Sequence, residues 1–143
     1  TICYSVGLRV SELINLKIND IDSNRMLIKI NNAKGKKDRI VPLSMNVLLL
    51  LREYYKQYKP KEYLFNDQFE LQYSIKSCQN IYKKYISSEL SIHNLRHCCF
   101  THLLENCTDI SIIQKIAGHQ NPKTTQIYTH ISQNLLNKVQ LPV

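Results

Sequence analysis

The stretch that decides the fold is residues 26–43, which read MLIKINNAKGKKDRIVPL. Apolar and polar residues alternate over Met26–Ile30, a pattern typical of a β-strand, and Arg39–Leu43 returns as a second strand. The residues between them, 31–38, are polar and include Gly35, which is typical of a loop. The stretch therefore predicts an antiparallel β-hairpin.

The tip of this hairpin carries the densest positive charge of the chain, formed by Lys34, Lys36, Lys37 and Arg39. The whole chain of 143 residues has 19 basic and 11 acidic residues and a net charge of +8. A basic cluster attracts a polyanion, and nucleic acid is the usual one. From charge alone, a merely solvated basic loop is an equal alternative.

Helical periodicity dominates the rest of the chain. One helix follows the N-cap candidate Ser44, with an apolar stripe of Val47, Leu48, Leu51, Tyr54, Tyr55 and Tyr58. The stripe of a later helix, 73–87, uses Ile75, Ile81, Tyr82 and Tyr85. The other expected helices are 9–16, 93–106 with Ser91 as its cap, 110–117 between Asp109 and Gly118, 122–128 and 132–139. Together with the hairpin, these elements predict an α+β fold that is mainly α, with one small antiparallel sheet.

Composition excludes several classes of protein. Hydrophobic residues make up 43% of the chain, enough for a real core, and no apolar run approaches the roughly 20 residues that span a bilayer. The five cysteines are an odd number without a CxxC pair, which favours reduced core thiols over disulfides or a zinc site. We therefore expect a cytoplasmic protein with no metal and no membrane partner.

Two residues of the expected helix 93–106 are spaced to hold one phosphate. His93 and Arg96 are three positions apart, which places their side chains on one helix face, about 5–6 Å apart at Cβ. A planar guanidinium can bind two phosphate oxygens at once. For this pair alone, and likewise for Arg9 alone, an ordinary solvated polar residue is the common explanation.

Four stretches together resemble the tyrosine recombinase (phage integrase) family, and closely its Xer-type branch. They are GLRVSEL at 7–13, KGKKDRIVPL at 34–43, HNLRH at 93–97 continued by THLL at 101–104, and GH at 118–119 followed by TTQIYTH at 124–130. They occur in the family's order and at its approximate spacing, and they cover nearly the whole chain. One departure follows the Leu-Arg-His run, where the family usually has a small residue or Ser/Thr, then Phe, then Ala. Here the order is Cys98, Cys99 and Phe100. The bulky Phe is therefore one position later, and we expect local repacking without loss of the chemistry.

The resemblance implies metal-independent cleavage and rejoining of DNA strands through a 3′-phosphotyrosine, with no cofactor. By position, Tyr128 resembles the nucleophile, whose usual pKa of about 10 means that it needs help near neutral pH. His93 matches the general acid/base, and Lys34 matches the lysine that protonates the leaving 5′-oxygen. Beside Lys34, we expect Lys36, Lys37 and Arg39 to contact the DNA.

The resemblance also implies a phosphate-binding set. Arg9 and Arg96 match the pair that binds the non-bridging oxygens, and His119 matches a residue that hydrogen-bonds the phosphate. Glu12 stands where an acidic residue supports Arg9. With Lys34, these cations supply the positive charge that a divalent metal ion supplies in many nucleases.

Family members act on double-stranded DNA and assemble with further protomers, as a tetramer on DNA and as a monomer or weak dimer when free. They normally carry a helical core-binding domain before the catalytic domain. We interpret residues 1–143 as an N-terminally truncated catalytic domain without that core-binding domain, and expect weak, salt-sensitive DNA binding. The expected setting is the nucleoid of a bacterium or phage host, and the expected role is integration of a mobile element.

Three alternatives stay open at this point. A type IB topoisomerase-like enzyme would form the same phosphotyrosine but would relax supercoils. A catalytically decayed integrase remnant would bind DNA without cutting it. A cytosolic scaffold would carry the basic loop incidentally.

Overall fold

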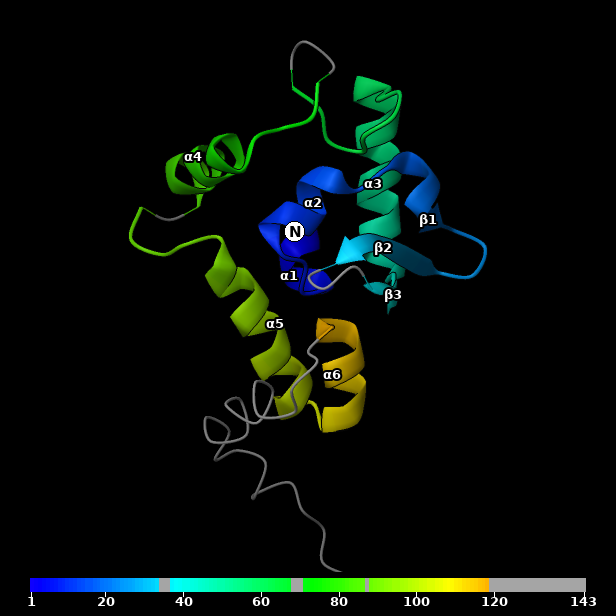
Figure 1. Cartoon of the computed structure of the whole chain (residues 1–143), viewed down its shortest axis with the longest axis vertical. Helices are drawn as coiled ribbons and strands as arrows, with labels where there is room; N and C mark the ends of the chain where they lie inside the picture. The colour runs from blue at the N-terminus through cyan, green and yellow to red at the C-terminus, as the bar shows by residue number, and fades with distance from the viewer. Residues whose placement is uncertain (34–36, 68–70, 87, 119–143) are drawn as a thin grey trace, which may run out of the picture.

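The computed structural model describes residues 1–33, 37–67, 71–86 and 88–118 (Figure 1). The elements, in chain order, are α1 (Ile2–Ser5), α2 (Val10–Asn15), the 3₁₀ helix η1 (Ile18–Asp20), β1 (Ile21–Asp22), β2 (Leu27–Ala33), β3 (Lys37–Pro42), α3 (Met45–Tyr58), α4 (Ile75–Tyr85), α5 (His93–Glu105) and α6 (Ile110–Ala117). The fold is therefore mainly helical with one small antiparallel sheet, which confirms the fold class expected from the sequence.

The predicted hairpin is present as β2 and β3, and β1 adds a third strand in the order β1-β2-β3. In the register of the sheet, Ile28 lies opposite Ile21 on one side and Val41 on the other, and the β2–β3 ladder is irregular between Ile30 and Ala33. Ile28, Ile30 and Val41 are buried. The sequence pattern did not reveal β1, because a strand of two residues is too short to show alternation.

The buried side chains form two clusters. The larger joins α1, the sheet and the first half of α3, and the smaller joins α5 to α6 around Phe100 and Ile113. Ile116 packs against both clusters. In Figure 1, α5 and α6 lie side by side below the sheet, so the two clusters meet where the ends of α6, α2 and the hairpin come together.

Gly7 fixes how the chain passes from α1 to α2. Its φ is +63°, a conformation that favours glycine, and a Cβ atom there would lie 2.7 Å from the Phe100 ring. The segment that precedes Arg9 is thereby held close against α5. A side chain at position 7 would push the two apart.

Several helix predictions are corrected by the structure. In α3, Tyr54 is only half-buried and Tyr55 and Tyr58 are 47% and 58% exposed, so the buried stripe ends at Leu51. α4 buries only Tyr82 among its described residues. The cap of α5 is Ile92, and Ser91 instead donates to the side chain of Asn94. The predicted helices 122–128 and 132–139 lie outside the described residues.

The predicted caps of α3 and α6 are confirmed. The Ser44 hydroxyl accepts a hydrogen bond from the Val47 amide, Asp109 accepts one from Ser111, and Gly118 ends α6 in the left-handed conformation. Cys3 and Cys99 are buried free thiols, and burial raises their pKa values to about 12 and about 11. No helix in the described part of the chain has the length and apolarity needed to cross a membrane.

Candidate functional site

The centre of the candidate site is the carboxylate of Glu12, in the first turn of α2. Its Oε2 accepts a hydrogen bond from the backbone amide of Arg9, which precedes the helix, at 2.8 Å. Its Oε1 accepts one from the Arg9 guanidinium, also at 2.8 Å. Arg39 of β3 donates to both carboxylate oxygens, at 2.6 and 2.8 Å. Glu12 thus ties the start of α2 to the hairpin.

The charge of Glu12 is maintained although the residue is only 5% exposed. Burial by itself would raise the pKa of this carboxyl group, but the hydrogen bonds and charge of Arg39 and the hydrogen bonds from Arg9 outweigh burial and lower the pKa to about 2. Glu12 is therefore ionised at neutral pH. The position expected for Glu12, in support of Arg9, agrees with this geometry.

Arg39 occupies a different place from the DNA contact expected of it. Its side chain is 8% exposed, and besides the bidentate bond to Glu12 its Nε donates to the carbonyl of Ile116 at 2.7 Å. All three nitrogens of the Arg39 guanidinium donate to Glu12 or to Ile116, so this side chain is not presented to a ligand on the surface. The structure therefore assigns Arg39 to an internal ion pair that connects β3, α2 and α6.

Arg96 is likewise buried, at 2% exposure, one turn after the start of α5. Its guanidinium donates to the carbonyl of Gly7 and, at 2.6 Å, to the carbonyl of Ala117, and it lies over the Phe100 ring at 4.7 Å. The bond to Gly7 links Arg96 directly to the segment that carries Arg9. The two arginines expected to act as a pair are thus joined through the backbone.

The C-terminal end of α6 is held by both buried guanidiniums. Arg39 binds the carbonyl of Ile116 and Arg96 binds the carbonyl of Ala117. The last carbonyls of a helix lack partners within the helix and carry its negative dipole end, so two cations satisfy and stabilise them. Gly118 follows with a φ of +63°, and a Cβ atom there would lie 3.1 Å from Cδ of Arg39. The chain therefore leaves α6 beside this pair of arginines.

His93 begins α5 and is exposed, with its ring 4.7 Å from the ring of His97 in an edge-to-face arrangement. Partial burial, followed by the charges of His97, Arg96 and Arg9, lowers the pKa of His93 below 6.5. Its imidazole is therefore neutral near pH 7 and can accept a proton. The charges of both arginines reach His93, which lies three positions before Arg96 on α5.

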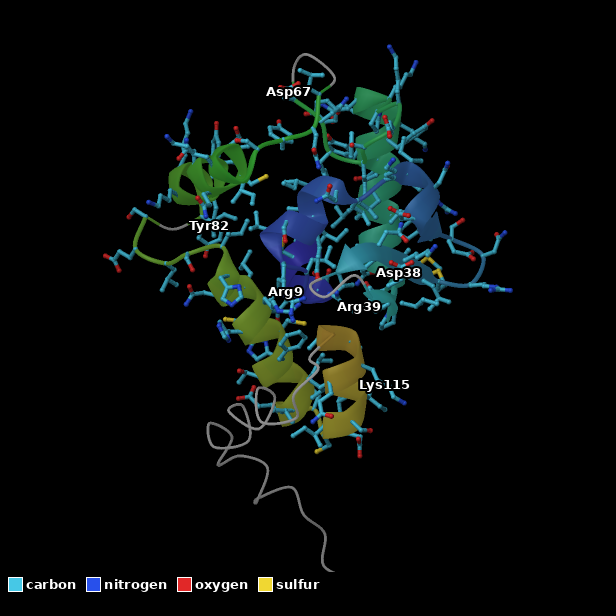
Figure 2. The ribbon with its side chains drawn as sticks, viewed as in Figure 1. Arg9, Asp38, Arg39, Asp67, Tyr82 and Lys115 are labelled. Carbon is cyan, nitrogen blue, oxygen red and sulfur yellow. The ribbon has the colours of Figure 1, made fainter. Side chains whose placement is uncertain are left out.

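The described part of the site is therefore one cluster of Arg9, Glu12, Arg39, His93 and Arg96, drawn from α2, β3 and α5. Figure 2 shows Arg9 and Arg39 where α1, α5, α6 and the hairpin meet. Arg9 remains 21% exposed and His93 is exposed, so a cation and a neutral imidazole face solvent above a buried charge network. Such a surface suits an anion that must also exchange a proton.

The remaining predicted site residues lie outside what the structure describes. They are Lys34, Lys36, His119 and Tyr128, and of Lys37 only the backbone at the start of β3 is described. Within the described ranges, no three His, Cys, Asp or Glu side chains are grouped in a way that could hold a metal ion.

From the sequence, Gly7 indicates the end of a short helix over residues 2–5, but its close approach to the Phe100 ring was missed. Sequence reasoning also missed the cations of α4, namely Lys76, Lys83 and Lys84, which are exposed on a helix that packs against α2. A run of lysines near the end of an expected helix was the available signal for these residues.

Comparison with known proteins agrees with this geometry. The model of the phage integrase family matches residues 1–134. The tyrosine recombinase XerA of Pyrococcus horikoshii is 40% identical over 144 residues, which cover 94% of this chain and 50% of that protein. A crystal structure of XerA recombinase superposes with a TM-score of 0.83 at 32% identity, covering 96% of this chain and 53% of the other.

A second solved structure is that of XerH site-specific recombinase bound to difH substrate in a pre-cleavage complex. It has a TM-score of 0.74 at 26% identity and covers 96% of this chain and 43% of that one. The chain spans about half the length of the curated relatives that it matches. Because the family model covers nearly the whole sequence and the fold agrees, this chain belongs to the phage integrase family.

Proposed function

We propose that this chain is the catalytic domain of a site-specific DNA recombinase that cuts and rejoins strands through a covalent phosphotyrosine. The observation that carries the proposal is the cluster of Arg9, His93 and Arg96. Arg9 precedes α2 and is bonded to the ionised carboxylate of Glu12. Arg96 shares α5 with His93 and is bonded to the carbonyl of Gly7, two residues before Arg9. Arginine, arginine and a neutral histidine are the groups that a phosphodiester needs for binding and for proton transfer.

In the proposed reaction, the Tyr128 oxygen attacks the phosphorus of a DNA phosphodiester and the 5′-oxygen leaves. The phenolic proton passes to the neutral imidazole of His93, and Lys34 donates a proton to the leaving oxygen. Arg9, Arg96 and His119 offset the charge on the non-bridging oxygens in the transition state. The phosphotyrosine keeps the phosphoryl group at the same level of esterification, so a 5′-hydroxyl can attack it later without ATP.

The cations on these residues supply the positive charge for this transfer, so the proposed reaction needs no metal or cofactor. Its substrate is double-stranded DNA, bound by Lys36 and Lys37 among others, with further copies of the protein assembling as a tetramer on the DNA. The known recombinases among its relatives support this assignment over a topoisomerase-like or decayed enzyme. We place this activity in the cytoplasm, at the nucleoid, and in mobile-element integration.

We further propose that residues 1–143 are one catalytic domain, and that a core-binding domain belongs to the whole protein. The relatives' greater length supports this. A domain that contacts only one side of the duplex forms few phosphate contacts, so DNA binding by the chain itself should be weak and sensitive to salt.

The test is a covalent-trapping experiment with duplexes of randomised sequence that carry a nick beside the expected cut. A nick lets the short downstream strand diffuse away and traps the phosphotyrosine, and randomised sequence removes the need to know the target site. At low salt, the chain should form a protein–DNA adduct that resists denaturation, and sequencing the trapped strands gives the preferred site.

Tyr128→Phe should abolish the adduct and leave DNA binding in a mobility-shift assay within about twofold, because only the attacking oxygen is removed. Tyr85→Phe, which alters another tyrosine on exposed α4, is the matched control and should retain the adduct. An undiminished adduct in Tyr128→Phe would show that another residue is the nucleophile. DNA binding without any adduct by the whole protein, with its core-binding domain, would identify a decayed remnant.

A further inference from the structure

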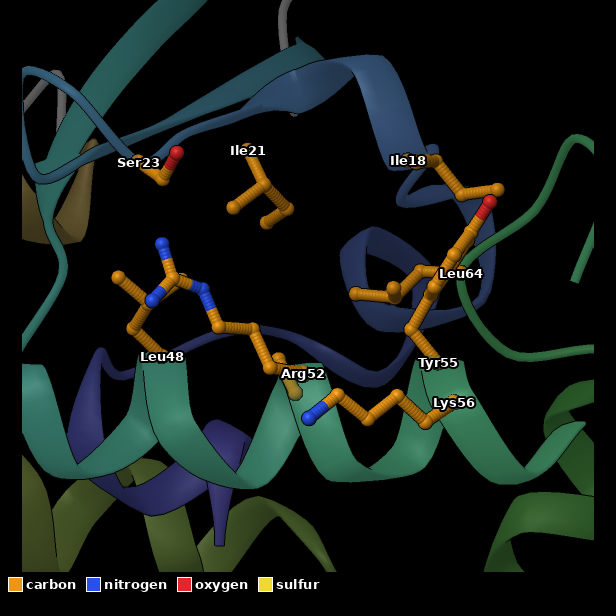
Figure 3. Close-up of a pocket in the computed structure, with 9 residues that line it drawn as sticks. Ile18, Ile21, Ser23, Leu48, Arg52, Tyr55, Lys56 and Leu64 are labelled. Atoms are coloured by element: carbon orange, nitrogen blue, oxygen red, sulfur yellow. The ribbon is translucent and has the colours of Figure 1, made fainter. Parts of the chain in front are cut away.

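A cavity of about 310 Å³ lies between α3 and the turn that follows β1, on a part of the molecule that shares no residue with the Glu12 network (Figure 3). Its walls include Ile21, Ser23, Leu48, Leu51, Arg52 and Lys56. A cavity of this volume falls at the lower end of the range that holds small molecules. The proposed recombination reaction makes no use of it.

The floor of the cavity is aliphatic. Leu48, Leu51 and Leu64 are buried members of the larger core cluster, and Ile21 is partly buried beside them. Only a small part of this aliphatic surface still faces water, and an apolar group that covers it stabilises the complex by about 25 cal/mol per Å². The floor therefore favours an occupant with a hydrocarbon body.

The rim of the cavity is cationic. Arg52 and Lys56 are both exposed, and Figure 3 shows the Arg52 guanidinium extending across the cavity toward Ser23 and Ile21. None of the described residues that line the cavity is acidic. Among the residues that the structure describes, neither Arg52 nor Lys56 forms an ion pair with a carboxylate. The rim thus offers two positive charges without an opposing negative charge.

We propose that this cavity binds a small amphipathic carboxylate, with its aliphatic body on the leucine floor and its carboxylate between Arg52 and Lys56. Charge complementarity selects an anion, and the apolar floor selects an anion with a hydrocarbon body over a bare phosphate. A guanidinium suits a carboxylate because its fork can donate two parallel hydrogen bonds. The site is independent of DNA and of Tyr128.

The test is a titration of the ¹⁵N-labelled chain, without DNA, with octanoate and in parallel with octan-1-ol. The alcohol has the same hydrocarbon chain but no charge. Octanoate should shift the amide signals around Ser23, Leu48 and Arg52, and octan-1-ol should bind about tenfold more weakly, because it lacks the charged hydrogen bonds. The affinity for octanoate should also fall as salt rises.

Two double variants of equal net charge distinguish octanoate binding in the cavity from attraction to the positive surface in general. Arg52→Gln with Lys56→Gln should weaken octanoate binding about tenfold, whereas Lys83→Gln with Lys84→Gln on α4 should leave it unchanged. Ser23→Trp, which fills the cavity from the turn, should abolish binding while thermal unfolding shows that the fold is kept.

Equal affinity for octanoate and octan-1-ol, or an unchanged affinity in the Arg52/Lys56 variant, would overturn the proposal. So would the absence of any shift at these amides. Displacement of octanoate by a short duplex would reassign the cations to DNA phosphates, and concentration-dependent shifts at these amides without any ligand would reassign the cavity to a second copy of the chain. None of these outcomes depends on adduct formation by Tyr128.

Discussion

At the scale of single residues, Glu12 has the clearest consequence for stability. Its pKa is about 2 in the folded chain, against 4.5 for an ordinary glutamate, because the bonds from Arg39 and Arg9 outweigh the effect of burial. A carboxyl whose pKa is lowered by folding stabilises the fold above its unfolded pKa. That stabilisation is lost as pH falls through the folded pKa.

We therefore expect the free energy of unfolding to fall by about 3 kcal/mol between pH 4.5 and pH 2 on account of Glu12, measured by urea denaturation. Glu12→Gln should be less stable at pH 7 and should show a flatter profile over this window. Glu53→Gln, at an exposed position of α3, is the matched control and should follow the wild type. A Glu12→Gln variant as stable as the wild type at pH 7 would contradict the role of the network.

Arg39 illustrates what sequence alone could not provide. In the sequence, Arg39 belongs to the basic cluster at the hairpin tip, and a cation there can either contact DNA or form a buried ion pair. Its partner Glu12 is 27 positions earlier in the chain, so the sequence does not show which of the two it does. Only the folded register of β3 shows that this cation faces inward. By contrast, the helical spacing and the family resemblance were sufficient to group Arg9, His93 and Arg96.

His97 allows a second prediction at the residue scale. Its ring contacts the ring of His93, and its charge contributes to the lowered pKa of His93, after the larger effect of burial. His97→Gln removes that charge and should raise the pKa of His93, measured from the imidazole proton signals in an NMR titration. His102→Gln, whose imidazole is instead bonded to the Tyr4 hydroxyl at 2.5 Å, should leave the pKa of His93 unchanged. An unaltered His93 titration in His97→Gln would contradict this coupling.

At the scale of elements, prediction succeeded where a local signal fixes a boundary. Ser44, Asp109 and Gly118 mark helix ends through backbone hydrogen bonds that they form themselves or through their own φ, so their effect does not depend on tertiary structure. The burial of Tyr55 and Tyr58 in α3 was predicted wrongly. Periodicity shows which face of a helix is apolar, but it does not show how far along the helix the core extends. The core beneath α3 ends at Leu51, which leaves Tyr55 and Tyr58 beyond it.

The helix α4 exposes its lysines and buries little of its surface. Among its described residues it buries only Tyr82, and its last turn exposes Lys83 and Lys84, with Lys84 5.1 Å from the ring centre of Tyr85. These lysines complement the negative dipole end of the helix. Because α4 packs against α2, which Arg9 precedes, we expect them also to contact DNA phosphates.

Replacing both lysines of that turn by Gln should weaken DNA binding and reduce the slope of log affinity against log salt by up to about 2, at about 0.9 for each phosphate contact. The Arg52/Lys56 double variant, with the same net charge, is the control and should keep the wild-type slope. If the lysines acted on the dipole alone, helix stability would change and the salt slope would not.

At the scale of the whole molecule, the candidate site lies where two clusters of buried side chains meet. Ile116 packs against both, and the bonds of Arg39 and Arg96 cross from one cluster to the other. The sequence could predict each cluster from apolar periodicity. It could not predict their junction, because that depends on carbonyls of Gly7, Ile116 and Ala117, and every residue type has a carbonyl.

The end of α6 therefore has a consequence for anyone who recombines parts of this fold. A truncation that stops before Ile116 removes the carbonyls that accept hydrogen bonds from Arg39 and Arg96. A chimera that exchanges the hairpin removes Arg39 and leaves the buried carboxylate of Glu12 without its bidentate partner. A buried polar group that loses its hydrogen-bond partner costs about 1–3 kcal/mol, a large share of a small domain's stability. The hairpin, α2 and the last turn of α6 should therefore be exchanged together in any chimera of this fold.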